Sequence, residues 1–179
     1  MELVNIQING KTVQAAKGAT VLQASRAAGI DIPTLCHDDR LEPYGACRMC
    51  MVEVQKKGRT RLVASCLFPV EEGLVVQTET EKTTRIRKMI IELLWPSAQG
   101  YAKRYGVTKS RFSTGMADCS LCGLCVRYCA EVKKSGLLFF KSRGIDRRPA
   151  LVEGSPLACG NCGECFSMCT SGWVVASRS

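Results

Sequence analysis

Apolar and polar positions alternate over residues 3–8, a pattern that predicts a half-buried β-strand. The Asn9-Gly10 pair follows directly and is a strong signal for a two-residue hairpin turn. A return strand is therefore expected over residues 11–15, so the chain opens with a β-hairpin.

Helical spacing replaces this alternation at residues 21–28, where Thr20 is a suitable N-cap and Gly29 a typical residue after a helix end. Three more strands are predicted, over residues 51–55, 61–65 and 74–78. A hairpin, a helix, a cysteine-containing loop and further strands together predict a β-grasp domain over residues 1–78.

A helical connector is predicted over residues 79–116. Residues 78–81 read Thr-Glu-Thr-Glu, which fits a capping box. Pro96 should end the first helix, and a second, short helix is expected over residues 97–105, closed by Gly106. The first helix carries an apolar stripe that we expect to pack against a neighbouring domain, formed by Ile86, Met89, Ile90, Leu93 and Leu94.

The last part of the chain, residues 117–179, contains an internal repeat with the spacing Cys-x2-Cys-x2-Cys-x3-Cys. The two copies lie forty residues apart and comprise Cys119, Cys122, Cys125 and Cys129, then Cys159, Cys162, Cys165 and Cys169. This is the ferredoxin spacing for [4Fe–4S] clusters. Zinc sites instead use two separated pairs that close one tetrahedron. Between the copies, residues 137–141 and 150–153 are expected to pair as a hairpin around Gly144.

In ferredoxins with two clusters, the fourth cysteine of each run ligates the other cluster. The repeat therefore predicts two [4Fe–4S] sites with exchanged fourth ligands. The predicted sets are Cys119, Cys122, Cys125 and Cys169 for the first cluster, and Cys159, Cys162, Cys165 and Cys129 for the second. The fold class expected for the whole chain is α+β, with a β-grasp domain, a helical connector and a two-[4Fe–4S] ferredoxin-like domain.

Four further cysteines, Cys36, Cys47, Cys50 and Cys66, lie within the predicted β-grasp domain. Four thiolates from a loop and a strand end can hold a flat [2Fe–2S] cluster. A zinc site is the alternative, because one Cys-x2-Cys pair is weak evidence by itself. His37, the only histidine, is expected to lie beside the site rather than to ligate, since Rieske-type ligation needs two histidines on one iron.

The composition agrees with clusters rather than disulfides. The first residues have neither a basic region nor a long apolar run, so we expect no signal peptide, no membrane span and a reducing, cytoplasmic setting. The net charge of +9 is offset in part by the clusters, which together carry about six negative charges. A nucleic-acid partner is not expected.

Several segments resemble the N-terminal ferredoxin domain of the large iron–sulfur chain of NADH-quinone oxidoreductase (complex I). They are residues 32–36 (Ile-Pro-Thr-Leu-Cys), 45–54 (Gly-Ala-Cys-Arg-Met-Cys-Met-Val-Glu-Val) and 64–66 (Ala-Ser-Cys). The domain also resembles those of small diaphorase subunits of NAD-reducing hydrogenases and formate dehydrogenases, and of iron-only hydrogenases. The two four-cysteine runs resemble the next module of the hydrogenase-type members. The resemblance implies a [2Fe–2S] cluster on Cys36, Cys47, Cys50 and Cys66.

The chain departs from this family in one loop. The family inserts a His-x3-Cys-x2-Cys-x5-Cys loop, which holds a further [4Fe–4S] cluster, whereas here residues 92–96 lead directly into residues 99–106. The N-terminal domain could fold back onto a cubane, swing between partners, or meet a partner's cluster. We expect it to swing, with the polar segment 79–88 as a solvated hinge. No hydrogen-activating domain is expected after Cys169.

No glycine-rich dinucleotide motif, phosphate loop or nucleophile–base pair is visible, so the chain is not expected to be an enzyme by itself. The family implies an electron-wiring subunit of a hetero-oligomer. It would link a flavin-containing NAD(P)H-oxidising subunit to a second redox subunit, such as a hydrogenase, a formate or aldehyde oxidoreductase, or a bifurcating flavoprotein. The alternatives are a free-standing polyferredoxin-like carrier and a zinc-stapled interaction module.

Overall fold

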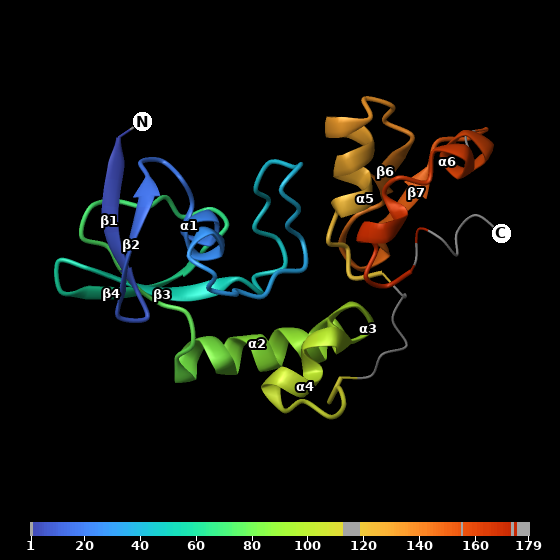
Figure 1. Cartoon of the computed structure of the whole chain (residues 1–179). Helices are drawn as coiled ribbons and strands as arrows, with labels where there is room; N and C mark the ends of the chain where they lie inside the picture. Colours follow the sequence, from blue (N-terminus) through green and yellow to red (C-terminus); the bar gives the residue numbers. More distant parts are fainter. Residues whose placement is uncertain (1, 113–118, 155, 173, 175–179) are drawn as a thin grey trace.

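A five-stranded mixed sheet forms the N-terminal part of the computed structural model, which describes residues 2–112, 119–154, 156–172 and 174 (Figure 1). Its strands are β1 (Leu3–Ile8), β2 (Lys11–Ala16), β3 (Met51–Lys56), β4 (Arg59–Ala64) and β5 (Val75–Gln77), in the order β2-β1-β5-β3-β4. Among these pairs, β1–β5 is parallel and the others are antiparallel. The predicted strands are confirmed to within two residues at each end.

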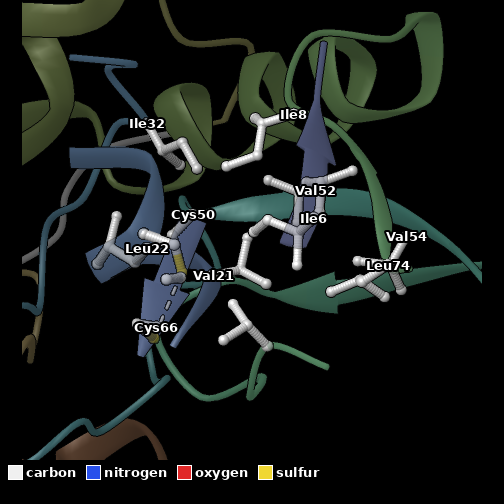
Figure 2. Close-up of a cluster of buried hydrophobic side chains, with 14 of the residues drawn as sticks. Ile6, Ile8, Val21, Leu22, Ile32, Cys50, Val52, Val54, Cys66 and Leu74 are labelled. Carbon is white, nitrogen blue, oxygen red and sulfur yellow. Dashed lines mark hydrogen bonds between the residues drawn. The ribbon is translucent and has the colours of Figure 1, made fainter. Parts of the chain in front are cut away.

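Helix α1 (Val21–Ala27) closes the core of this sheet. Thr20 and Gln23 form a complete capping box, and Gly29 takes the left-handed conformation expected after a helix end. Figure 2 shows Val21 and Leu22 among sheet residues such as Ile6 and Val52, with Cys50 and Cys66 at the edge of the same cluster. The core of the N-terminal part therefore extends directly to two of the candidate ligands.

Four helical segments follow the sheet: α2 (Glu81–Leu93), α3 (Trp95–Ala98), η1 (Gln99–Tyr101) and α4 (Ala102–Tyr105). The N-cap of α2 is Thr80, which pairs with Thr83 in a capping box, so the predicted box at residues 78–81 is two residues too early. Gly106 ends α4 in the left-handed conformation, as predicted.

The buried face of α2 differs in part from the predicted stripe. Met89 and Leu93 are 41% and 51% exposed, whereas Ile91 and the charged Arg87 are fully buried. The helix is turned so that Arg87 faces backbone carbonyl groups of the sheet, which supply the hydrogen bonds that a buried guanidinium needs. Ile90 remains on the buried face and belongs to a cluster with the cysteine loop, as the stripe predicted.

The C-terminal part contains α5 (Leu124–Arg127), the π-helical turn η2 (Tyr128–Val132), β6 (Leu138–Lys141), η3 (Gly144–Asp146), β7 (Arg148–Leu151), α6 (Pro156–Cys162) and η4 (Phe166–Met168). β6 and β7 form the predicted antiparallel hairpin. Leu41, from the loop before β3, is buried in the core of this part. Across the described ranges, no helix is long and apolar enough to cross a membrane.

Candidate metal centres

The structure brings the four N-terminal cysteines together as two close pairs. The backbone N–H of Cys47 donates to Cys36 Sγ at 3.3 Å. The Sγ atoms of Cys50 and Cys66 lie 3.4 Å apart, as the dashed line in Figure 2 marks. The charges of Cys36, Cys47 and Cys50 all raise the pKa of Cys66, so the two pairs also lie within electrostatic reach of each other.

Within each pair, one thiol is poised to be a thiolate near neutral pH. Hydrogen bonding to Cys36 lowers the pKa of Cys47 to about 6, and hydrogen bonding to Cys66 lowers that of Cys50 to about 6. The pKa values of Cys36 and Cys66 are raised by the same hydrogen bonds. Because the thiolate is the form that binds metal, each pair presents one ready ligand atom.

The loop that carries Cys47 and Cys50 has a tightly constrained backbone. Gly45 and Arg48 both have left-handed φ angles, of 69° and 59°. A Cβ atom at Gly45 would overlap the Leu67 side chain, so this close approach requires glycine. The N–H of Met49 also donates to Cys47 Sγ at 3.4 Å, which turns a backbone dipole toward the candidate ligand.

Arg87 of α2 supports this loop from inside the protein. Its Nε donates to Met49 O at 3.2 Å and its Nη2 to Met51 O at 2.7 Å, so it bonds to the carbonyls on either side of Cys50. Its Nη1 donates to Tyr105 Oη at 3.3 Å and pairs with Glu79 at 2.8 Å. Sequence reasoning missed this residue, although its four-residue spacing from Thr83 and Ile91 placed it on the buried face.

Two cavities in the C-terminal part are each lined by four cysteines. One is nearly closed, at about 10 Å³, and is lined by Cys119, Cys122, Cys125 and Cys169. The other has a volume of about 330 Å³ and is lined by Cys129, Cys159, Cys162 and Cys165. The last cysteine of each run thus lines the cavity of the other run.

Burial is the main cause of the pKa shifts of two of these thiols, one in each cavity. It raises the pKa of Cys125 to about 12 and that of Cys165 to about 11, and the neighbouring cysteine charges raise them further. The neighbours that act on Cys125 include Cys169, which lines the same cavity, and Cys165, which lines the other cavity, and Cys129 acts on Cys165. The thiols of the two cavities therefore lie within electrostatic reach of one another. A positive metal partner would favour the thiolate forms of Cys125 and Cys165, and iron is such a partner.

The N-terminal site lies against the first four-cysteine run. Cys47 and Cys122 line one apolar cavity of about 390 Å³, together with Ile90 and Leu94 of the α2 end. The charge of Cys47 also contributes to the raised pKa of Cys122, after burial as the main cause. The structure therefore has the folded-back arrangement, and a swinging domain stays a prediction that this arrangement does not require.

The expectation of a solvated hinge at residues 79–88 is wrong. The segment lies in and just before α2, and Thr83 and Arg87 on one face of this helix are fully buried. Arg87 holds α2 against the cysteine loop and the start of β3 through its bonds to Met49 O and Met51 O. The remaining charged residues of the segment are exposed. His37 is nearly buried beside the first pair of cysteines and its Nε2 lies 3.0 Å from Asp39.

Comparison with known proteins adds independent information. Residues 1–81 match the family of 2Fe-2S iron-sulfur cluster binding domains. The chain is 32% identical to NADPH-Fe(3+) oxidoreductase subunit alpha of Geobacter sulfurreducens and 31% identical to NADP-reducing hydrogenase subunit HndD of Solidesulfovibrio fructosivorans. These matches cover 97% and 98% of this chain, but only 24% and 36% of the relatives. The chain thus spans about a quarter to a third of their length.

Two further matches agree. The NADH-ubiquinone oxidoreductase 75 kDa subunit of Reclinomonas americana is 32% identical over 73% of this chain, and the match covers 23% of that relative. Among solved structures, an NAD+-reducing [NiFe]-hydrogenase in its H2-reduced state matches with a TM-score of 0.74 and 29% identity. That match covers 85% of this chain and 76% of the hydrogenase chain. The chain is therefore a relative of the large iron–sulfur subunit of NADH-ubiquinone oxidoreductase and of NAD(P)-linked hydrogenase subunits, with a 2Fe-2S domain at its N-terminus.

Proposed function

We propose that this chain is a non-catalytic electron-transfer subunit that carries one [2Fe–2S] and two [4Fe–4S] clusters. It would connect a flavin-containing NAD(P)H-oxidising subunit with a second redox subunit of the same hetero-oligomer. The observation that carries the proposal is the sorting of twelve cysteines into three groups of four, one at the sheet and one in each C-terminal cavity.

The pairing within the N-terminal group fits a two-iron cluster. In a [2Fe–2S] rhomb each iron takes two thiolates and two sulfides, so the four cysteines divide into two pairs. Cys36 with Cys47 and Cys50 with Cys66 are such pairs. A zinc site needs four ligands around one point, whereas the hydrogen bonds here sort the four thiols into two pairs.

The two cavities fit cubanes for a similar reason. Among the described residues, each cavity is lined by four thiols, and the one carboxylate in either lining is that of Glu164, which is already paired with Lys133 and Tyr128. The proposed ligands are Cys119, Cys122, Cys125 and Cys169 for one cubane and Cys159, Cys162, Cys165 and Cys129 for the other. When bound, the clusters supply reversible one-electron storage, and the protein contributes burial and hydrogen bonds that set their potentials.

The relatives support a role inside a complex. Their names include a subunit of an NADPH-linked oxidoreductase, a subunit of an NADP-reducing hydrogenase and a subunit of NADH-ubiquinone oxidoreductase. A free-standing carrier remains the competing proposal within the redox class. Affinity purification of the tagged chain from its native host tests this point, and recovery of the chain without stoichiometric partners would favour the carrier.

The first test of the proposed function is the cluster inventory. Anaerobically purified protein should contain about ten irons and about ten acid-labile sulfides per chain. Its reduced form should show a [2Fe–2S] signal in electron paramagnetic resonance (EPR) spectra besides the cubane signals. Zinc without sulfide would contradict the whole proposal. About eight irons without a [2Fe–2S] signal would contradict only the assignment at the N-terminal site.

A second prediction concerns whether the chain itself can oxidise NADH or NADPH. The purified chain should not oxidise NADH or NADPH with an artificial electron acceptor, because its sequence contains no dinucleotide-binding motif. The same preparation should accept electrons from dithionite, which shows that its clusters are competent. Turnover of NADH that rises in proportion to the concentration of the chain would show that it is itself catalytic.

A further inference from the structure

Part of the loop that leads to Cys47 packs against the C-terminal part of the molecule. Residues 40–44, called here the docking loop, lie between the sheet and α5 (Figure 1). Leu41 is 5% exposed and belongs to the buried cluster that contains Leu124 and Tyr128. The docking loop ends three residues before Cys47, so its position constrains that cysteine.

Arg127, the last residue of α5, bonds to the docking loop in two ways. Its Nη2 donates to the backbone carbonyl of Glu42, and its guanidinium carbon lies 4.9 Å from the centre of the Tyr44 ring. Its Nε donates to Glu131 Oε1 at 2.9 Å, which holds the guanidinium in a fixed orientation. The side chain is only 11% exposed, a position in which such charge-assisted bonds are strong.

Glu131 completes the arrangement from the other side. Its Oε2 accepts a hydrogen bond from the backbone N–H of Glu42 at 3.2 Å, so the N–H and the carbonyl of this residue are both bound by the Arg127–Glu131 ion pair. A second cation–π contact, of Arg40 over the Tyr128 ring at 4.8 Å, lies at the start of the docking loop. The contacts are thus distributed along the whole segment.

Both ends of this interface connect directly to candidate ligands. Arg127 lies between Cys125 and Cys129, one from each cysteine set, and the docking loop leads to Cys47. On the far side of the interface, Cys47 and Cys122 line the same apolar cavity.

We propose that Arg127 is a positioning residue that locks the docking loop onto α5, so that the N-terminal cluster site and the first cubane site lie directly against each other. This inference rests on the proposed function for the clusters. The contacts of Arg127 with the docking loop, called here the lock, are made by the polypeptide alone. It makes residues 1–78 a fixed part of the molecule.

The test compares Arg127→Gln with the exposed control Arg143→Gln in the full-length, cluster-loaded protein. In the fully reduced wild-type protein, the first cubane is a nearby paramagnetic centre and should shorten the spin relaxation time of the [2Fe–2S] centre. We expect Arg127→Gln to lose most of this relaxation enhancement, Arg127→Lys to retain part of it through the Glu131 ion pair, and Arg143→Gln to equal wild type.

A second measurement does not depend on the clusters. Hydrogen exchange at the amide of Glu42 should become about tenfold faster in Arg127→Gln, because one charge-assisted hydrogen bond is lost and its partner Glu131 is released. Tyr44→Leu is a second variant, to be used also if Arg127→Gln folds poorly. It removes the ring contact with Arg127 and should likewise accelerate the exchange of the Glu42 amide. Wild-type relaxation together with wild-type exchange in both variants would overturn the lock.

The outcomes separate the two proposals. A wild-type protein without a [2Fe–2S] signal, but with accelerated exchange in the variants, would overturn the cluster assignment and leave the lock standing. A wild-type protein with all its clusters, and with both relaxation and exchange unaffected by the variants, would overturn the lock and leave the cluster assignment standing.

Discussion

Replacement of Cys169 by alanine is expected to remove the cubane of the first cysteine run, not that of the run to which Cys169 belongs. Cys169 lines the cavity of Cys119, Cys122 and Cys125, so its loss leaves that cavity with three thiols. Iron should fall from about ten to about six atoms per chain if the three-thiol site cannot retain its cluster. If a three-iron remnant persists, the loss is smaller, but the altered EPR signal still belongs to the first cubane.

The assignment is made by comparison of variants. The EPR spectrum of Cys169→Ala should match that of Cys122→Ala, and the spectrum of Cys129→Ala should match that of Cys162→Ala. In each comparison, both variants lack one ligand of the same proposed cubane, so their spectra should show the same change. A match of Cys169→Ala with Cys162→Ala would show that each run binds its own cluster, and the exchanged ligand sets would be wrong.

The second large effect is expected at Arg87. Its replacement by methionine removes the donors to Met49 O and Met51 O and leaves both carbonyls buried without partners. A buried acceptor that loses its donor costs about 1–3 kcal/mol, so we expect a loss of about 3 kcal/mol of folding free energy for the two carbonyls together. For a chain of this size, that corresponds to a fall of about 6–12 °C in the anaerobic melting temperature.

The matched control is Arg85→Met, on the exposed face of the same helix. It changes the charge and helix propensity equally but removes no buried contact, so its melting temperature should stay close to that of wild type. Arg87→Met should also lower the midpoint potential of the [2Fe–2S] centre, because a buried positive charge near Cys50 favours the reduced state. Equal melting temperatures for the two variants would show that the buried network contributes nothing to stability.

Local sequence signals predicted the N-terminal fold well. The alternation of residues 3–8, the Asn9-Gly10 turn and the Thr20 cap each depend on neighbours within four positions. The cysteine spacing likewise identified the candidate ligands, because cluster-binding loops impose a spacing on the chain itself. The approach of each fourth cysteine to the opposite cavity was also predicted, from the behaviour of two-cluster ferredoxins, and the ligand roles stay a prediction.

The long-range polar contacts could not be predicted in the same way. Arg87 bonds to carbonyls 36 and 38 positions away, and Arg127 bonds to a carbonyl 85 positions away. Backbone carbonyls carry no sequence signature, so a buried arginine looks like any other charged residue of a helix. For that reason the sequence pattern predicts a hydrated segment at residues 79–88 and a buried face that includes Met89 and Leu93, whereas the structure buries Arg87 and exposes these two residues.

The crossing of the fourth cysteines has a consequence for how the protein is made. Cys169 leaves the ribosome fifty residues after Cys119, and until then the first cavity has only three of its thiols. The second cavity already has Cys129 when its own run is synthesised. A truncation between the two runs would therefore leave neither site complete, and we expect the proposed clusters to be inserted into the finished C-terminal part rather than into each run as it emerges.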